Sequence, residues 1–230
     1  MNNKMEIFDQ IKGQLVVSCQ ALPEEPLHSS YIMSKMAFAA MLGGAKGIRA
    51  NSVDDIRAIK NKVNLPIIGI IKVVYDNSDV YITPTRKEID LLVEEGVEII
   101  AIDATKRVRP DGTVISEVFP EIRKQYKDQI FMADCSTYEE AVEAYKLGFD
   151  CIGTTLSGYT SYTKGVQLPN ITLLKKLVTD LPVPIIAEGG IWTPEQLKDC
   201  MNAGIYAAVV GTAITRPMDI TKRFIRAIES

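Results

Sequence analysis

A lysine and a glutamate each stand at the end of an apolar run, where a buried strand would end. Lys72 follows the run Pro-Ile-Ile-Gly-Ile-Ile, and Glu188 closes the run Ile-Ile-Ala-Glu. Desolvation at such a position lowers the pKa of a lysine and makes a neutral amine available as a base. A carboxylate there can carry a proton or position the lysine. The alternatives are a rim lysine that reaches water or only balances a phosphate, and a glutamate in a structural ion pair. An ionised Glu188 nearby would raise the pKa of Lys72, against the effect of burial.

Further polar side chains follow other apolar runs in the same way. Arg49 and Asp134 could bind substrate hydroxyls, an acetamido oxygen or a phosphate, or could form a buried structural pair. Gln20 carries an amide that donates and accepts, which suits sugar hydroxyls or an N-acetyl group. Polar groups beside so many apolar runs predict a polar pocket over an apolar core. The residues at the ends of the eight runs are Gln20, Arg49, Lys72, Asp103, Asp134, Thr154 with Thr155, Glu188 and Gly211.

Glycines follow the last two apolar runs. Gly189-Gly190 and Gly211-Thr212 would let backbone N–H groups approach the oxygens of a phosphate closely. Arg216 could add a charge-assisted contact. Tight turns without a ligand are the alternative. Because loops after strands seven and eight are the common phosphate site of α/β barrels, the pattern predicts a small phosphorylated metabolite as ligand. The long segment 153–169, rich in Thr, Ser, Tyr and Gly, is typical of a lid or binding loop, or else of a solvated connection.

These side chains would be positioned by a repeated unit of helix, glycine and short apolar strand. Gly43, Gly96, Gly148 and Gly204 end helical stretches, where glycine supplies a left-handed residue. Each apolar run that follows is typical of a strand buried on both faces in a parallel sheet. The strands predicted in this way are 15–19, 47–50, 67–71, 98–103, 130–134, 151–153, 184–188 and 207–211.

Helix starts alternate with these strands. Thr85, Thr137 and Thr193 each open a capping box, and Ser52 opens another helix. Eight alternating units about 27 residues apart favour one closed (β/α)8 barrel, a TIM barrel, formed by the single domain 1–230. An open doubly wound sheet would need a Gly-rich turn after an early strand, and none is present. Residues 1–12 predict an extra N-terminal helix that covers the barrel floor.

Composition excludes several classes of protein. The chain has 230 residues, of which 47% are hydrophobic and 24% charged, as in ordinary globular proteins. A net charge of −3 without a basic block disfavours binding to nucleic acid or to anionic membranes. No apolar run approaches the roughly 18 residues of a membrane-spanning helix. Residues 1–12 lack the apolar core of a signal peptide, so we expect a cytoplasmic protein.

Metal and thiol chemistry are also disfavoured. His28 is the single histidine, which argues against zinc or iron sites built on several imidazoles, and we read it as a loop residue. The four cysteines fit no disulfide framework and are expected to be buried, inert thiols. We therefore expect no zinc or iron site of this kind.

Seven motifs, in this order along the chain, resemble the N-acetylmannosamine-6-phosphate 2-epimerase family. The resemblance runs from about residue 13 to the C-terminus, and no single motif would be specific on its own. The motifs are Ser18-Cys-Gln-Ala-Leu-Pro23, Gly47-Ile-Arg-Ala-Asn51, Pro66-Ile-Ile-Gly-Ile-Ile-Lys72, Met132-Ala-Asp134, Gly153-Thr-Thr-Leu156 with Gly158-Tyr-Thr160, Ile186-Ala-Glu-Gly189 and Val210-Gly-Thr-Ala-Ile-Thr-Arg-Pro217.

The resemblance implies a bacterial cytoplasmic isomerase of amino-sugar and sialic acid breakdown, with a barrel of the ribulose-phosphate-binding type. It implies that N-acetylmannosamine 6-phosphate and N-acetylglucosamine 6-phosphate are interconverted without metal or cofactor. The family's catalytic lysine and glutamate fall on Lys72 and Glu188. Its phosphate end falls on the glycines and Arg216, and its sugar-contacting residues fall on Gln20, Arg49 and Asp134, to which we add Thr155. Val73 and Thr212 depart from the family's pattern, which has a basic residue and a glycine there, and phosphate affinity could differ.

This chemistry suits the residues. Opening the sugar ring exposes an aldehyde at C1, which makes the C2 proton acidic. Lys72 would remove that proton, and either Glu188 or a substrate hydroxyl would return one to the opposite face. Arg49 or Gln20 could stabilise the charge that develops on O1.

Other activities are compatible with the same residues. A lyase or aldolase could use Lys72 to form a Schiff base, and a silent sugar-phosphate sensor is a further alternative. A metal-dependent pentose-phosphate epimerase conflicts with the single His28. Enzymes of this kind are often symmetric, so we expect a homodimer.

Overall fold

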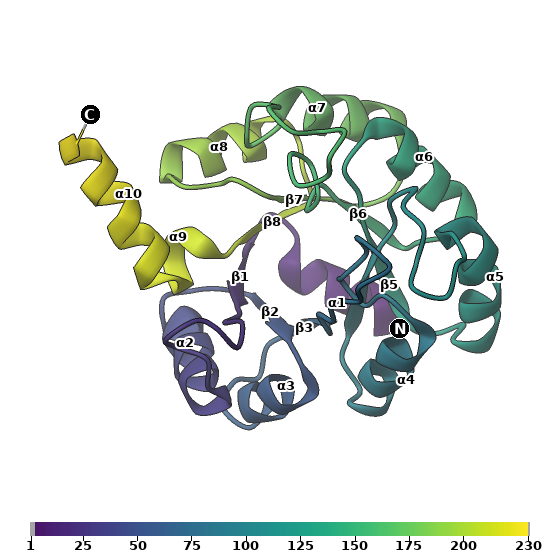
Figure 1. Cartoon of the computed structure of the whole chain (residues 1–230), viewed down its shortest axis with the longest axis horizontal. Coiled ribbons are helices and arrows are strands. Elements are labelled where there is room, and N and C mark those ends of the chain that lie inside the picture. The colour runs from purple at the N-terminus through teal and green to yellow at the C-terminus, as the bar shows by residue number, and fades with distance from the viewer. Residues whose placement is uncertain (1–2, 230) are drawn as a thin grey trace.

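A computed structural model describes residues 3–229 of the chain (Figure 1). Its strands form one closed parallel barrel in which each strand pairs with its neighbours in sequence and β8 pairs with β1. The predicted barrel is therefore confirmed, and the open sheet is excluded. The strands are β1 (Leu15–Cys19), β2 (Gly47–Asn51), β3 (Ile67–Ile70), β4 (Ile99–Asp103), β5 (Ile130–Asp134), β6 (Cys151–Gly153), β7 (Ile185–Glu188) and β8 (Ala207–Val210).

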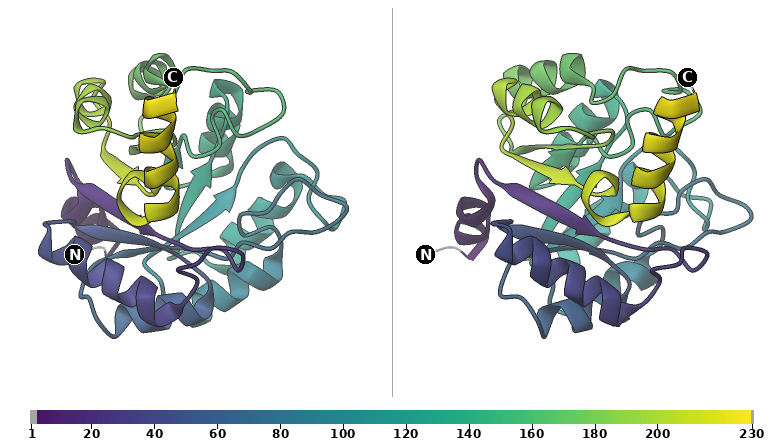
Figure 2. Two further views of the ribbon diagram at one scale, coloured as in Figure 1. Left: turned by 60° about the vertical axis from the view of Figure 1, so that its left-hand side comes forward. Right: turned by 90° about the vertical axis from the view of Figure 1, so that its left-hand side faces the viewer.

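Helices surround this barrel, as the side views show (Figure 2). Each predicted strand matches an observed one with ends that differ by one residue at most. The helices are α1 (Asn3–Ile11), α2 (Ser30–Leu42), α3 (Val53–Lys60), α4 (Arg86–Glu94), α5 (Ile115–Gln125), α6 (Tyr138–Leu147), α7 (Ile171–Asp180), α8 (Pro194–Asn202), α9 (Thr212–Thr215) and α10 (Pro217–Glu229).

The predicted helix ends are confirmed with one correction. Thr137 and Thr193 accept hydrogen bonds from the backbone at the starts of α6 and α8, as capping boxes do. Gly148 ends α6 in the left-handed conformation, with φ of 89°. After α2, however, Gly43 has φ of −74° and the left-handed residue is Gly44, with φ of 102°. The helix simply runs one residue further than the pattern indicated.

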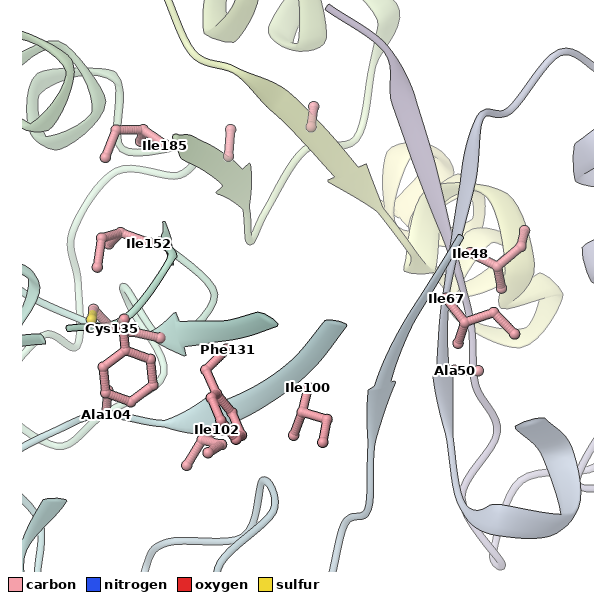
Figure 3. Packing of buried hydrophobic residues seen from close by; sticks show 14 of the residues in the cluster. Ile48, Ala50, Ile67, Ile100, Ile102, Ala104, Phe131, Cys135, Ile152 and Ile185 are labelled. Atoms are coloured by element: carbon pink, nitrogen blue, oxygen red, sulfur yellow. The ribbon is translucent and has the colours of Figure 1, made fainter. Parts of the chain in front are cut away.

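Alternation along each strand divides the core into two layers. Ile68 and Ile70 of β3 point into the barrel, whereas Ile67 points out towards the helices. Residues of the outer layer, among them Ile48, Phe131 and Ile185, fill the space between strands and helices (Figure 3). Because both faces are covered, these strands are mostly apolar, and their charged side chains lie in the mouth half of the barrel. The parity of Ile68 and Ile70 also directs the next even residue, Lys72, to the inside of the barrel mouth.

The N-terminal helix covers the barrel floor as predicted. Ile7 and Ile11 are buried in the inner layer, and Phe8 packs against it. Lys4 Nζ fixes the helix to the barrel through an ion pair of 2.9 Å with Asp150 Oδ1.

The cysteines are buried and unpaired, as predicted. Burial raises the pKa of the Cys19 thiol to about 12 and that of Cys200 to about 11, so neither forms a thiolate at neutral pH. Among the helices of residues 3–229, none is long and apolar enough to cross a bilayer.

Candidate active site

A pocket of about 430 Å³ opens at the carboxyl ends of the strands. It brings together residues from both ends of the chain. The side chains and backbone that line it include Ser18, Gln20, Arg49, Lys72, Val74, Tyr81, Ile82, Thr155, Tyr159, Glu188, Gly189, Gly190, Ile191, Trp192, Gly211, Thr212, Thr215 and Arg216.

Arg49 joins two carboxylates beneath this pocket. Its Nη2 lies 2.6 Å from Asp134 Oδ2 and its Nη1 donates to Asp134 Oδ1 at 3.1 Å. The same Nη1 lies 2.9 Å from Glu188 Oε2. Gly153 makes room for this arrangement, because a Cβ there would lie 2.3 Å from the Met132 methyl and 3.3 Å from Asp134 Oδ1.

The charge of Arg49 is fixed by its partners. Burial alone would lower the pKa of its guanidinium, but the carboxylates of Asp134 and Glu188 outweigh burial and raise it. A buried cation therefore stands permanently at the base of the pocket. Its Nε has no hydrogen-bond partner within residues 3–229.

Two threonines at the end of β6 orient Glu188. The Thr155 hydroxyl lies 2.6 Å from Asp134 Oδ1 and 3.3 Å from Glu188 Oε2. Thr154 Oγ1 accepts from the Glu188 N–H at 3.2 Å and reaches its carbonyl at 3.0 Å. The carboxylate of Glu188 is therefore held from its backbone and from its tip.

The pKa of Glu188 is raised to about 7. Burial is the main cause and the negative charge of Asp134 adds to it, while Arg49 and Lys72 oppose them. A carboxyl group with this pKa exchanges its proton at neutral pH, which suits an acid catalyst.

Lys72 shifts in the opposite direction. Its pKa is lowered to about 8, first by burial and then by the positive charges of Arg49 and Arg216, against the opposing carboxylates. The competition between burial and Glu188 is thus decided in favour of burial. The Lys72 N–H donates to Asn51 Oδ1 at 2.7 Å, which fixes its backbone. A neutral amine is accessible near neutral pH.

Gln20 offers an unused acceptor at the pocket wall. Its Nε2 donates to Ser18 Oγ at 2.7 Å. Its Oε1 is buried and has no partner within the described part of the chain. Since a buried acceptor without a partner is costly, this oxygen is suited to a donor from a ligand.

The predicted phosphate residues gather at one side of the pocket. Gly189 and Gly190 have φ of 106° and 70°, which favours glycine, and a Cβ on Gly190 would lie 2.3 Å from the Cβ of Leu168. Gly211 has φ of −113°, so its role is close packing: a Cβ there would lie 3.1 Å from Ser18 Cβ. Thr212 begins α9, and Arg216 Nη2 lies 3.3 Å from Glu25 Oε2.

Most of the predicted site residues line the pocket, and the exceptions have clear partners. Asp134 is fully buried below Arg49 and reaches no pocket surface. Asp103 pairs with Arg107 and accepts from the Thr105 hydroxyl at 2.7 Å, which is a structural role. His28 Nδ1 lies 3.0 Å from the Ala21 carbonyl oxygen and does not line the pocket.

Sequence reasoning missed three aromatic side chains. Tyr81, Tyr159 and Trp192 all line the pocket. Tyr159 belongs to the predicted binding segment 153–169, and its composition was the available signal. Nothing in the sequence around Tyr81 indicated that it would return to the barrel mouth. Within residues 3–229, no three His, Cys, Asp or Glu side chains are placed to hold a metal ion.

Fold and site together define the class of protein. A (β/α)8 barrel whose mouth holds a lysine of lowered pKa and a glutamate of raised pKa in one pocket has the kind of site that enzymes use to move protons. The chain belongs to the NanE family, described as "Putative N-acetylmannosamine-6-phosphate epimerase", whose model matches residues 33–230. The resemblance drawn from the seven motifs is thereby confirmed.

Relatives agree over nearly the whole chain. A protein of Clostridioides difficile named "Putative N-acetylmannosamine-6-phosphate 2-epimerase" is 52% identical over 97% of this chain and 99% of its own. A protein of the same name from Clostridium perfringens is 56% identical over 95% of this chain and 98% of its own. The solved structure of the N-acetylmannosamine-6-phosphate 2-epimerase from Clostridium perfringens has a TM-score of 0.91 and 54% identity, covering 96% of this chain and 95% of that one. Thiamine phosphate pyrophosphorylase from Pyrococcus furiosus, with a TM-score of 0.62 and 16% identity, shares the fold.

Proposed function

We propose that this protein is an isomerase that interconverts N-acetylmannosamine 6-phosphate and N-acetylglucosamine 6-phosphate by moving a proton at C2. One observation supports the chemistry above all: a single pocket holds Lys72, with a pKa of about 8, and Glu188, with a pKa of about 7. Each can gain or lose a proton at neutral pH. The relatives named above supply the substrate class.

The first step is removal of the C2 proton. The ring-opened sugar has an aldehyde at C1, which acidifies the C–H bond at C2. The neutral Lys72 amine takes this proton and becomes an ammonium ion, and the electron pair passes to O1 as an enediolate-like intermediate. Arg49, at the pocket base, carries the positive charge that can stabilise that oxygen, while the free Gln20 Oε1 can accept a hydrogen bond from a substrate O–H or N–H group.

The second step returns a proton to the opposite face of C2. Glu188, protonated as an acid, is one donor, and a substrate hydroxyl recharged by Lys72 or Glu188 is the other. Thr155 keeps the Glu188 carboxyl oriented through its contact of 3.3 Å with Oε2. Reprotonation at C2 restores the C1=O1 double bond that the first step opened, so the substrate is neither oxidised nor reduced overall and the two steps need no redox cofactor.

The phosphate is bound at the side of the pocket formed by Gly189, Gly190, Gly211 and Thr212. Their backbone N–H groups can approach phosphate oxygens, and Arg216 supplies the positive charge. Asp134 acts from below, through Arg49, rather than by direct contact with the sugar. Since sugar phosphates are charged metabolites of the cell interior, we infer a cytoplasmic enzyme.

Two other functions lead to different experimental results. A Schiff-base lyase or aldolase would be trapped on Lys72 by borohydride in the presence of substrate. A sensor would bind sugar phosphate with full affinity and never turn it over. The presence of Lys72 and Glu188 in one pocket favours the epimerase over a sensor, because a site that only binds needs neither a base nor an acid.

We also infer a homodimer formed through α10. Phe224 and Ile228 of this helix are 71% and 82% exposed, and Figure 1 shows it projecting from the barrel. The Arg223 guanidinium lies 4.8 Å from the centroid of the Trp192 ring, so Arg223 is on the side of α10 that meets the barrel, and Phe224 and Ile228 lie about 100–140° further round the helix, exposed to solvent. A helix of 13 residues is marginal alone in water. A second copy of the chain would present the same Phe224 and Ile228, so the two helices could pack against each other about a two-fold axis.

The dimer is tested by light scattering after size exclusion. Phe224→Glu combined with Ile228→Glu should give a monomer, while Lys222→Glu, on another face of α10, should leave the dimer intact. A wild-type monomer, or a dimer that survives the double substitution, would contradict the proposal.

The reaction is tested by proton NMR of the protein with N-acetylmannosamine 6-phosphate in D₂O, with chelator present. We expect N-acetylglucosamine 6-phosphate signals together with loss of the C2 proton signal. Binding without either change would reject the epimerase and favour the sensor. New aldehyde or ketone products would favour the lyase.

A further inference from the structure

A short segment, residues 81–83, lies between the ends of β3 and β4 and beside Lys72. The last residue pair of the β3–β4 ladder is Gly69 with Ile100. Beyond that pair, the backbone of Ile82 forms an antiparallel bridge with Lys72. The segment therefore separates the ends of two strands that would otherwise continue to pair.

Backbone hydrogen bonds fix the segment on both sides. It is joined to the residues around Lys72 on one side and to β4 on the other. The bonds are Thr83 N to Ile71 O at 2.8 Å, Val73 N to Tyr81 O at 3.0 Å and Asp103 N to Ile82 O at 3.1 Å. The position of Lys72 thus depends on the position of this segment.

Thr83 holds a backbone conformation that side chains branched at Cβ rarely adopt. Its φ is 47°, and its side chain is completely buried. Its hydroxyl donates to the Ala101 carbonyl at 2.7 Å and lies 3.4 Å from the Ile71 N–H. Such a conformation persists only where surrounding contacts enforce it, and it is concentrated at functional sites.

Arg109 supplies those contacts from the loop after β4. Its guanidinium donates to three backbone carbonyls and, within residues 3–229, forms no ion pair with a carboxylate. The carbonyls are those of Thr83 and Asp103, both at 2.8 Å, and of Pro84 at 2.9 Å. The side chain is 3% exposed and does not line the pocket. Each of its three nitrogens therefore helps to tie the turn after Thr83 to the end of β4.

We propose that Thr83 and Arg109 are positioning residues for the proton transfer, which hold Lys72 in the barrel mouth through residues 81–83. The inference rests on the proposed function, because it assigns the amine of Lys72 as the base. Without these contacts the turn can relax to an ordinary backbone conformation. The bridge between Ile82 and Lys72 is then lost, and water reaches the amine.

The charges around Lys72 come from other elements. They are Arg49 of β2, Arg216 after α9, Glu188 of β7 and Asp134 of β5. Neither Thr83 nor Arg109 forms a hydrogen bond or ion pair with any of these four. A change in the titration of Lys72 after substitution of Thr83 or Arg109 would therefore report the position and hydration of Lys72, not the loss of a neighbouring charge.

The test compares Thr83→Val with Thr83→Ser in the full-length protein, across pH 6 to 10. Valine keeps the shape and removes the hydroxyl, whereas serine keeps the hydroxyl. For Thr83→Val we expect a kcat at least tenfold lower, a KM within twofold of wild type, and the limb of the pH–rate profile near pH 8 moved upward by half a unit or more. Thr83→Ser should stay within threefold of wild type with an unmoved limb.

Several outcomes would overturn the inference. The inference is wrong if the limb near pH 8 stays in place in Thr83→Val. It is also wrong if kcat falls as far in Thr83→Ser as in Thr83→Val. If Thr83→Val does not fold, the test uses Arg109→Lys, because one ammonium group cannot bind all three carbonyls. The limb near pH 8 should again move upward. If it does not move, the inference is wrong. A wild-type protein without epimerase activity rejects the proposed function itself, whereas an active wild type with unshifted variants rejects only the positioning role.

Discussion

Arg49 and Asp134 form a bidentate ion pair in the centre of the barrel mouth, with both side chains excluded from water. The pair lies directly below Glu188, which contacts the same Arg49 nitrogen at 2.9 Å. Asp134 consequently shares the guanidinium with Glu188 and keeps it in one orientation. This contact fixes the position of the cation, and through it Arg49 partly opposes the rise in the pKa of Glu188 that burial causes.

Removing the charge of Asp134 should therefore damage both stability and turnover. Asp134→Asn leaves the Arg49 charge underpaired in a buried place, for which we expect a loss of about 3 kcal/mol in the free energy of unfolding. We also expect kcat to fall by at least tenfold. Urea unfolding and the epimerase assay measure the two effects. The exposed Asp128→Asn is the matched control, and equal behaviour of the two variants would refute the role of the pair.

Lys72 should be essential for turnover and dispensable for binding. Replacing a general base typically lowers the rate by about 10²- to 10⁴-fold, so Lys72→Ala should show at least the lower value in kcat. Trp192 is the single tryptophan and lines the pocket, so its fluorescence can follow substrate binding. Lys62→Ala, at an exposed site, should behave as wild type. Retained turnover in Lys72→Ala would require a different base.

The pH–rate profile should be bell-shaped with its maximum between the two pKa values. Lys72 must be neutral, which is favoured above its pKa of about 8, and Glu188 must be protonated, which is favoured below its pKa of about 7. The active form has a neutral Lys72 and a protonated Glu188, and it carries the same number of protons as the form in which both side chains are charged. The ratio of these two forms therefore does not change with pH. The limbs of the profile fall near the two pKa values and belong to the pair of groups rather than to either residue. Measurement of kcat/KM from pH 5.5 to 9.5 tests this. A single limb that rises to a plateau would show that Glu188 is not the acid.

Glu188 should also make stability depend on pH. Because its pKa is raised on folding, the folded state holds a proton that the unfolded state has lost between about pH 4.5 and 7. Its contribution to the free energy of unfolding is present below this window and is lost as the pH rises through it, by about 1–3 kcal/mol. Glu188→Gln should flatten the curve in this range. Parallel curves for the two proteins, measured by urea unfolding, would contradict the raised pKa.

The glycine at position 190 should be required for its backbone and for space. Gly190→Ala combines φ of 70° with a Cβ placed 2.3 Å from Leu168 Cβ. We expect a loss of about 1–3 kcal/mol and a KM at least fivefold higher, since the phosphate side of the pocket must shift. Gly165→Ala is a matched control, because φ is 86° there and nothing lies within 4 Å. If Gly165→Ala changes stability and KM as much as Gly190→Ala does, backbone strain alone is the cause and the contact with Leu168 has no role.

The sequence by itself determined the barrel and which side chains meet at its mouth. Strand ends and parity are local properties: Ile68 and Ile70 alternate with Gly69, so Lys72 had to face the inside of the mouth. Because parallel strands end at one edge, Gln20, Arg49 and Glu188 had to meet there. The helix starts followed from hydrogen bonds between residues three apart, and these also lie within a short window of sequence.

Only the tertiary structure decided what each polar group does. Arg49 pairs with Asp134, which is 85 residues further along the chain, and no local pattern could show that this pair would form. The pKa of Lys72 depends on burial and on four charges from other elements, which no local pattern contains. The same holds for Tyr81 and Trp192, and for the segment 81–83. Its course is set by Arg109 and β4, because hydrogen bonds to backbone carbonyls leave no trace in the identity of the residues that accept them.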